Sequence, residues 1–128
     1  MRLRFDDREL TLLRAAEQVR GATLAHSPRP DQLRTALNLA KAGHKVSQAG
    51  AGSSISLDEP ELNLLLEAVR HAVDEVQWAA RIGDADDARR RNAVLTRFPE
   101  LVEHAWRTFG LARELEALAG RLHSALTS

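Results

Sequence analysis

The most constraining feature of the sequence is an apolar stripe that runs through residues 58–82. Its members recur at intervals of three and four residues, the period of one face of an α-helix. They are Leu62, Leu65, Leu66, Val69, Ala72, Val73, Val76 and Ala80. At a rise of ~1.5 Å per residue, this helix is roughly 37 Å long. A helix with one apolar face needs other helices to cover that face, so the stripe predicts the spine of a helical bundle.

The composition also favours helices. Ala (21) and Leu (20) supply about a third of the 128 residues, whereas Val and Ile together supply nine. Ala and Leu are good helix formers, and β-branched residues favour strands. We therefore predict an all-α, single-domain bundle of five or six helices.

Turn-forming residues and apolar periodicity give the expected boundaries. Helices are predicted near 6–24, 30–45, 58–82, 84–97, 99–109 and 111–126. We expect Gly110 to separate the last two helices. The inward residues of the second helix are predicted to be Leu33, Ala36, Leu37 and Ala40. In this organisation, residues 1–46 form a helical hairpin, 47–56 a flexible Gly/Ser linker and 57–128 the main bundle unit.

A weak internal repeat relates residues 3–13 to residues 55–65, at an offset of 52. Each copy has the pattern of a capping box, in which an Asp begins the helix and a Glu follows three residues later. The pairs are Asp6 with Glu9, and Asp58 with Glu61. Short apolar alternations before each Asp predict two very short strands, 3–5 and 55–57, that pair. Two interpretations stay open: a true duplication, or two ordinary helix starts.

The distribution of charge indicates the kind of partner, and the lack of targeting signals indicates the compartment. Lys+Arg 18 balance Asp+Glu 18, yet residues 1–56 carry nine basic and five acidic side chains (+4) and the remainder carries −4. Such a split favours self-association or the orientation of an anionic partner. We find no signal-peptide pattern and no apolar run that would cross a membrane, so we expect a cytoplasmic protein. Arg outnumbers Lys 16 to 2, which fits the codon bias of a high-GC bacterium.

The sequence gives little support to catalysis. Without cysteine, thiolate catalysis, Cys-ligated zinc and iron–sulfur clusters are excluded. No Gly-x-Ser-x-Gly motif is present, and the paired carboxylates fall at helix starts, where they offset the positive end of the helix dipole. We therefore predict that the protein is not an enzyme and has no cofactor.

A metal site is the next possibility, because Glu67, His71 and Glu75 share one helical stripe. Di-iron bundles use Glu-x-x-His, whereas the Glu67/His71 and Glu100/His104 spacings are one residue longer. We therefore predict no metal, and a solvated stripe in which Glu67 and Glu75 pair with Arg70 and Arg81.

One face of the second predicted helix suggests nucleic-acid binding. Three cations and an amide repeat along it at helical spacing: Arg34, Asn38, Lys41 and Lys45. Arg2 and Arg4 lie in the same positive half and are expected to add phosphate contacts. The alternative is a solvated amphipathic helix.

A second apolar strip on the long helix suggests a protein interface. Its residues are Leu64, Ala68, Trp78 and Ile82, and either burial in the core or a homodimer contact explains it. A further apolar cluster follows the long helix: Phe98, Leu101, Val102, Ala105, Trp106 and Phe109. We expect it to lie in the core, and to form a binding groove if half of its residues are exposed. The cations Arg89, Arg90 and Arg91 are expected to be neutralised within their own helix by Asp86 and Asp87.

These observations predict a non-catalytic protein–protein interaction or regulatory module that is homodimeric. The alternative function is a nucleic-acid-binding accessory protein that uses the basic face of the second helix.

Overall fold

A computed structural model describes residues 1–27, 29–81, 88–103 and 107–127. It confirms the all-α bundle with a short N-terminal sheet. The described elements follow in chain order: β1 (Arg2–Arg4), α1 (Asp7–Ala25), α2 (Pro30–Gln48), β2 (Ser54–Ser56), α3 (Glu59–Arg81), α4 (Ala88–Arg97), α5 (Glu100–Glu103) and α6 (Thr108–Thr127).

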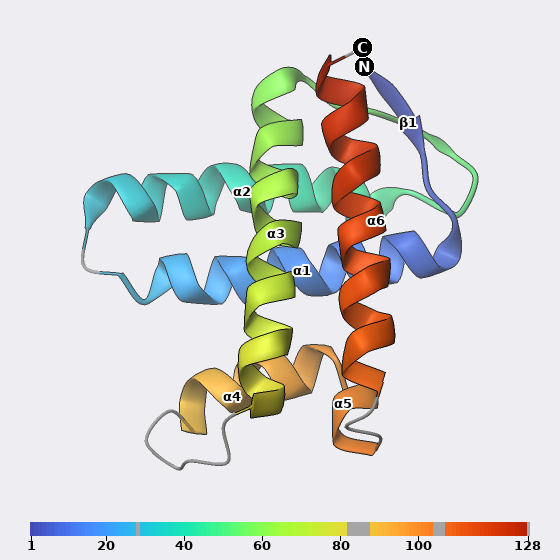
Figure 1. Cartoon of the computed structure of the whole chain (residues 1–128). Helices are drawn as coiled ribbons and strands as arrows, with labels where there is room; N and C mark the ends of the chain where they lie inside the picture. Colours follow the sequence, from blue (N-terminus) through green and yellow to red (C-terminus); the bar gives the residue numbers. More distant parts are fainter. Residues whose placement is uncertain (28, 82–87, 104–106, 128) are drawn as a thin grey trace.

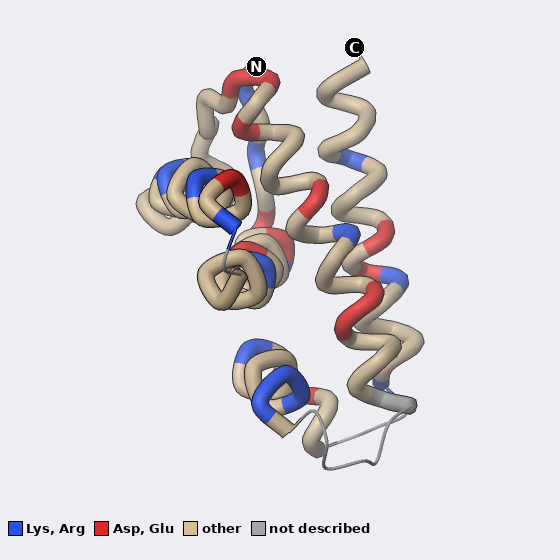
Figure 2. The backbone as a smooth tube through the Cα atoms, turned by 90° about the vertical axis from the view of Figure 1, so that its left-hand side faces the viewer, with Lys and Arg blue, Asp and Glu red and all other residues tan. Residues whose placement is uncertain are grey.

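Two helix pairs make up the bundle. α1 and α2 form an antiparallel hairpin, and α3 and α6 lie side by side across it (Figure 1). Seen from the side, α1 and α2 are nearly end-on against the α3–α6 pair (Figure 2). α4 and α5 lie at one end of the long helices, and β1 lies at the other (Figure 1). One hydrophobic core joins buried residues from α1, α2, α3, α4 and α6.

The two short strands pair as predicted, with each strand beginning one residue earlier. β1 and β2 are antiparallel, and Leu3 faces Ile55 in the register. The pairing extends by one residue, because the Met1 amine donates to the Leu57 carbonyl at 2.9 Å and the Leu57 N–H donates to the Met1 carbonyl at 2.8 Å. The sheet therefore fixes the starts of α1 and α3 next to each other.

Both predicted capping boxes are confirmed. At α1, the Glu9 N–H donates to the Asp6 carboxylate at 2.7 Å, and the Asp6 N–H donates to Glu9 at 3.1 Å. At α3, the Glu61 N–H donates to Asp58 at 2.8 Å, and the Asp58 N–H donates to Glu61 at 3.0 Å. Each box pairs N–H groups that the first helical turn leaves without a partner.

The predicted orientation of α2 is wrong for three of its four predicted inward residues, and Ala36 is half-buried against the core. Leu33, Leu37 and Ala40 are exposed, whereas Leu39 and Val46 are buried. α2 carries two apolar stripes on different sides of the helix. The stripe that contains Leu39 and Val46 faces α1 and α3. Leu33 and Leu37 therefore remain in solvent.

The close approach of α1 and α2 supports this orientation. Gly43 of α2 lies against the side chain of Glu17 in α1, so closely that an added Cβ would come within 2.6 Å of Glu17 Cδ. Burial raises the pKa of Glu17, and the nearby Arg97 opposes this shift. A larger side chain at position 43 would have to displace the Glu17 carboxylate.

The prediction for Gly110 is also wrong. α6 begins at Thr108 and passes through Gly110, which lies in the first turn, where N–H groups lack intrahelical acceptors in any sequence. The predicted helix 99–109 includes residues 104–106, and the predicted helix 84–97 includes residues 84–87, all outside the described residues.

Candidate functional site

The surface with the clearest binding character is the solvent-facing side of α2. Pro30 in its first turn suits a helix start, because proline lacks the N–H that would have no acceptor there. At the other end, Arg14 of α1 donates to the carbonyls of Val46 and Ala49 at 3.3 and 3.0 Å. These contacts fix α2 on α1, so the side chains on its outer side have defined places.

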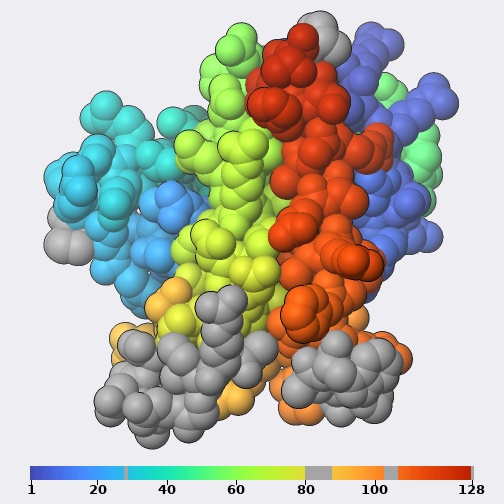
Figure 3. Space-filling model, in the orientation of Figure 1, coloured from blue at the N-terminus to red at the C-terminus, as the bar shows by residue number. Residues whose placement is uncertain are grey.

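The outer side of α2 divides lengthwise into two strips. The apolar strip consists of Leu33, Leu37 and Ala40; Leu33 is 42% exposed and Leu37 67%. The basic strip consists of the exposed residues Arg34, Asn38 and Lys41. We call these two strips together the outward face of α2. Figure 3 shows α2 projecting beside α3, and Figure 2 shows basic residues along α2.

Lys45, the fourth predicted nucleic-acid residue, is engaged within the fold. Its Nζ lies 2.8 Å from Glu61 Oε1 and 3.4 Å from the Ser56 carbonyl oxygen. Burial alone would raise the pKa of Glu61, but hydrogen bonds from Lys45 and from the Asp58 backbone lower it. Lys45 therefore ties α2 to the start of α3 and contributes less charge to the surface than Lys41.

Arg2 and Arg4 are exposed on β1, beside the C-terminal end of α2. Arg2 pairs with Ser56, whose carbonyl also accepts from Lys45. The Arg4 carbonyl accepts from Arg121 of α6 at 2.8 Å. The structure thus brings Arg2 near the Lys45 end of α2, and Arg34 lies toward the other end of that helix.

The apolar strip predicted as an interface on α3 turns toward the chain's own core in its described part. Ala68 is fully buried, and Leu64 and Trp78 are half-buried against the core. The guanidinium of Arg90 lies 3.8 Å from the Trp78 ring centroid and covers part of that ring. Ile82 lies outside the described residues.

The acidic stripe of α3 differs from the solvated one that the sequence predicts. Glu67 is exposed, but Glu75 is 4% exposed and pairs with Arg90 of α4. The side chain of Arg81, one of the two predicted partners, lies outside what the structure describes. His71 Nε2 lies 3.7 Å from Glu75 Oε1 and 3.3 Å from the Thr23 hydroxyl. The described residues include no group of three metal-ligating side chains, and His104 is not among them.

Half of the described residues of the predicted apolar cluster around α5 are buried and half are exposed. Phe98 and Leu101 are buried, whereas Val102 is 67% exposed and Phe109 85%. Ala105 and Trp106 lie outside the described residues, as do Asp86 and Asp87, the predicted partners of the arginines in α4.

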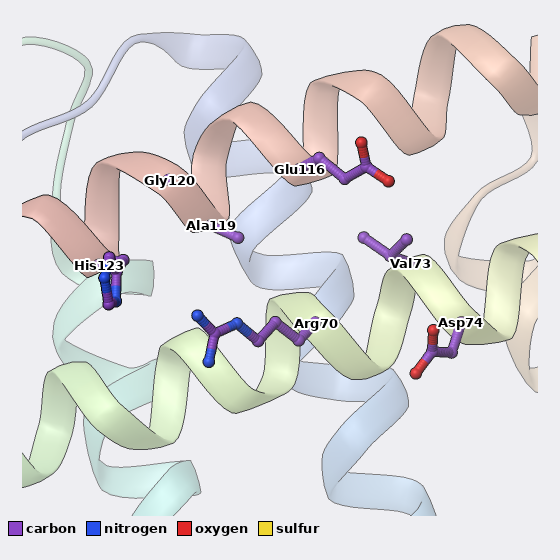
Figure 4. A pocket seen from close by; sticks show the side chains of 7 residues that line it. All are labelled: Arg70, Val73, Asp74, Glu116, Ala119, Gly120 and His123. Atoms are coloured by element: carbon purple, nitrogen blue, oxygen red, sulfur yellow. The ribbon is translucent and has the colours of Figure 1, made fainter.

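A shallow hollow of about 510 Å³ lies between α3 and α6. Arg70 and His123 lie toward one end, Asp74 and Glu116 toward the other, and Val73 lies between them (Figure 4). Its lining carries charges of both signs and it is open to solvent, so the outward face of α2 has the more distinctive chemistry.

The fold and these surfaces define a small all-α bundle with a two-stranded N-terminal sheet. In its described part, no helix is both long and apolar enough to cross a lipid bilayer. Comparison with known proteins gives no match: none to a family model, none to a curated protein and none to a solved structure.

Sequence reasoning missed the exposure of Leu33 and Leu37, and the signal that would have found it was present. Leu39, Ala42 and Val46 form their own stripe at helical spacing. Its small residue, Ala42, and its β-branched residue, Val46, pack well in a helix interface. Two competing stripes on one helix mean that one of them faces solvent. Gly43, between Ala42 and Val46, permits close contact between α2 and α1 on the buried side.

Proposed function

We propose that the protein is a non-catalytic interaction module that docks an acidic amphipathic helix of a partner protein on the outward face of α2. The observation that carries this proposal is the pairing of exposed leucines with cations along one helix. Leu33 and Leu37 are spaced to contact one side of a docked helix, and Arg34 and Lys41 lie beside them. Amphipathic helices contact their partners through apolar residues three and four positions apart.

Charge favours a partner other than a second copy of the chain. In a symmetric antiparallel contact centred on Leu37, the basic strips of both copies would gather at one interface. Like charges brought together at an interface cost binding free energy. An acidic helix would instead pair its carboxylates with Arg34 and Lys41 and cover the leucines. The homodimer stays a prediction from the sequence.

The composition of the outward face of α2 favours binding of a protein over binding of a nucleic acid. Phosphate binding needs cations, and Lys45 is partly neutralised by Glu61. Exposed leucines beside the remaining cations add little to contacts with phosphate, whereas burying them is the main gain in a protein interface. Nucleic-acid binding is therefore the competing outcome of the experiment below.

The experiment measures binding of a designed helical peptide by fluorescence anisotropy. The peptide has leucines at i, i+3, i+4 and i+7 flanked by glutamates, and its control has lysines in place of the glutamates. We expect the acidic peptide to bind with a Kd on the order of 100 µM or tighter, and the basic peptide at least about tenfold more weakly. Leu37→Glu is expected to abolish binding, and Lys41→Glu to weaken it about fivefold or more.

Two matched variants on another helix, α6, control for general effects of adding negative charge to the surface. Phe109→Glu replaces an exposed apolar residue on α6 and Arg113→Glu reverses an exposed charge there; neither should change peptide binding. Equal losses in Leu37→Glu and Phe109→Glu would overturn the proposal. So would tighter, steeply salt-dependent binding of a random DNA duplex that Lys41→Glu weakens, or dimerisation that Leu37→Glu removes in sedimentation.

A further inference from the structure

A pocket of about 490 Å³ lies between α1, α3 and α4. Its floor is apolar and comes from two helices: Val19 and Ala22 of α1, and Ala93 and Val94 of α4. No residue of α2 lines it, so it is separate from the outward face of α2. Its volume falls within the range of about 300–1,000 Å³ that is typical of small-molecule sites.

The pocket exists because small side chains meet where the two helices approach each other. Ala22 and Ala93 are both half-buried, and neither reaches across the space between α1 and α4. A second hollow of about 240 Å³ continues along the same helices and shares Val19, Ala22, Arg89 and Ala93 with the first. The two hollows together form an elongated slot with an apolar floor.

The polar groups of the pocket leave an excess of positive charge at its rim. The buried carboxylate of Glu75 lies at the inner side and is matched by two hydrogen bonds from Arg90, at 2.8 and 2.6 Å. Arg89 and His26 line the rim and are exposed. Within the described part of the chain, Arg89 has no ion pair. An anion at the rim would therefore meet a guanidinium that no carboxylate of the described residues neutralises.

Guanidinium groups bind carboxylates through paired hydrogen bonds, and the imidazole N–H of His26 offers another donor. A carboxylate at the rim would place an attached hydrocarbon group over the floor, where burial of apolar surface is favourable. We propose that this pocket binds a small organic anion, with its carboxylate between Arg89 and His26 and its apolar part on Val19, Ala22, Ala93 and Val94.

Three probes of equal chain length separate the contributions of charge and apolar contact: octanoate, octan-1-ol and octylammonium. Calorimetric titration of the full chain should give octanoate a Kd on the order of 1 mM. The alcohol and the ammonium compound should bind at least about tenfold more weakly, because they lack the carboxylate.

Two variants and one control locate the site. Arg89→Gln is expected to weaken octanoate binding about fivefold or more, whereas Arg113→Gln on α6, another exposed arginine, should leave it unchanged. Ala93→Phe should abolish binding by filling the floor, provided that circular dichroism shows the helical fold. If Ala93→Phe does not fold, Arg89→Gln decides the question alone.

The proposal is overturned by any of three results. The first is no octanoate binding at about 10 mM. The second is equal binding of octanoate and octan-1-ol, which would show that charge at the rim plays no part. The third is equal octanoate binding by the wild-type chain and Arg89→Gln. Loss of binding in Arg89→Gln with retained binding in Arg113→Gln supports the pocket.

Discussion

Arg90 of α4 binds the buried carboxylate of Glu75 in α3 through two hydrogen bonds, from Nε to Oε2 at 2.8 Å and from Nη2 to Oε1 at 2.6 Å. Among the described residues, Glu75 is the one buried charged side chain. A buried carboxylate is costly unless a cation and hydrogen bonds compensate it. The pair therefore fixes how α4 packs against the long helix, and the stacking of Arg90 on Trp78 orients the guanidinium.

Removing Arg90 is expected to destabilise the fold, because it leaves the Glu75 carboxylate buried without its cation. Loss of one partner of a fully buried pair costs about 3–5 kcal/mol. Since the Arg90 side chain is 46% exposed and water reaches part of the site, we expect Arg90→Gln to lower the free energy of unfolding by about 2 kcal/mol. Urea denaturation followed by circular dichroism measures this change.

A double-mutant cycle separates the pair from the other contacts of Arg90. Arg90→Gln combined with Glu75→Gln should destabilise by at least about 1 kcal/mol less than the two single changes added together. Arg113→Gln, an exposed control on α6, should stay within about 0.5 kcal/mol of the wild type. Additive effects of the two changes would contradict the proposed coupling.

The two capping boxes should each contribute measurably to stability. Asp6→Ala and Asp58→Ala each remove a carboxylate that accepts from a first-turn N–H, and we expect each to cost about 1 kcal/mol. Asp6→Asn, which keeps an acceptor, should cost less than half as much. Asp7→Ala removes an acidic residue from the same turn without removing the cap. If Asp7→Ala costs as much as Asp6→Ala, the effect comes from the helix dipole and not from the box.

The capping boxes and the positions of the two short strands could be predicted from the sequence because their signals are local. Asp6 and Glu9 need only each other and the backbone between them, and the same holds for Asp58 and Glu61. The pairing itself joins Leu3 to Ile55, 52 positions apart, and the matching place of the two strands in the repeat is the signal that suggests it.

The orientation of α2 and the Glu75–Arg90 pair could not be predicted in this way. Leu37 and Leu39 both belong to plausible apolar stripes, and only the packing of α2 against α1 and α3 shows which of them is buried. For Glu75, the sequence suggests Arg70 or Arg81 in its own helix as the partner. Its actual partner is 15 positions further along the chain, which only the return of α4 onto α3 brings close.

Replacing Leu37 and Leu39 of α2 separately tests the observed orientation. Leu39→Ala removes a side chain that is 1% exposed and is expected to lower the free energy of unfolding by about 2–4 kcal/mol. Leu37→Ala removes one that is 67% exposed and should change it by less than about 0.5 kcal/mol. Thermal and urea unfolding of both variants measure the difference, and the reverse order would show that α2 is turned the other way.

The stability of the fold is expected to depend on pH through His71, which contacts both Glu75 and Thr23 of α1. Burial lowers the pKa of His71 from its ordinary value of 6.5; Glu75 opposes this shift, Arg20 and Arg90 add to it, and Asp74 opposes it. The unfolded chain therefore binds a proton at His71 more readily than the folded chain. Stability from this group is fully present above pH 6.5 and is lost as the pH falls from 6.5 through the lower pKa of the folded state.

His71→Gln should remove this dependence while keeping a polar side chain near the Thr23 hydroxyl, which lies 3.3 Å from His71 Nε2. We expect the wild-type chain to lose more stability than His71→Gln when the pH falls from about 7.5 to about 5.5. Urea denaturation at both pH values gives the two differences, and His123→Gln, at an exposed position on α6, serves as the control. Identical losses in the wild type and His71→Gln would show that His71 titrates alike in the folded and unfolded chains, and a larger loss in His71→Gln would reverse the sign of its linkage to folding.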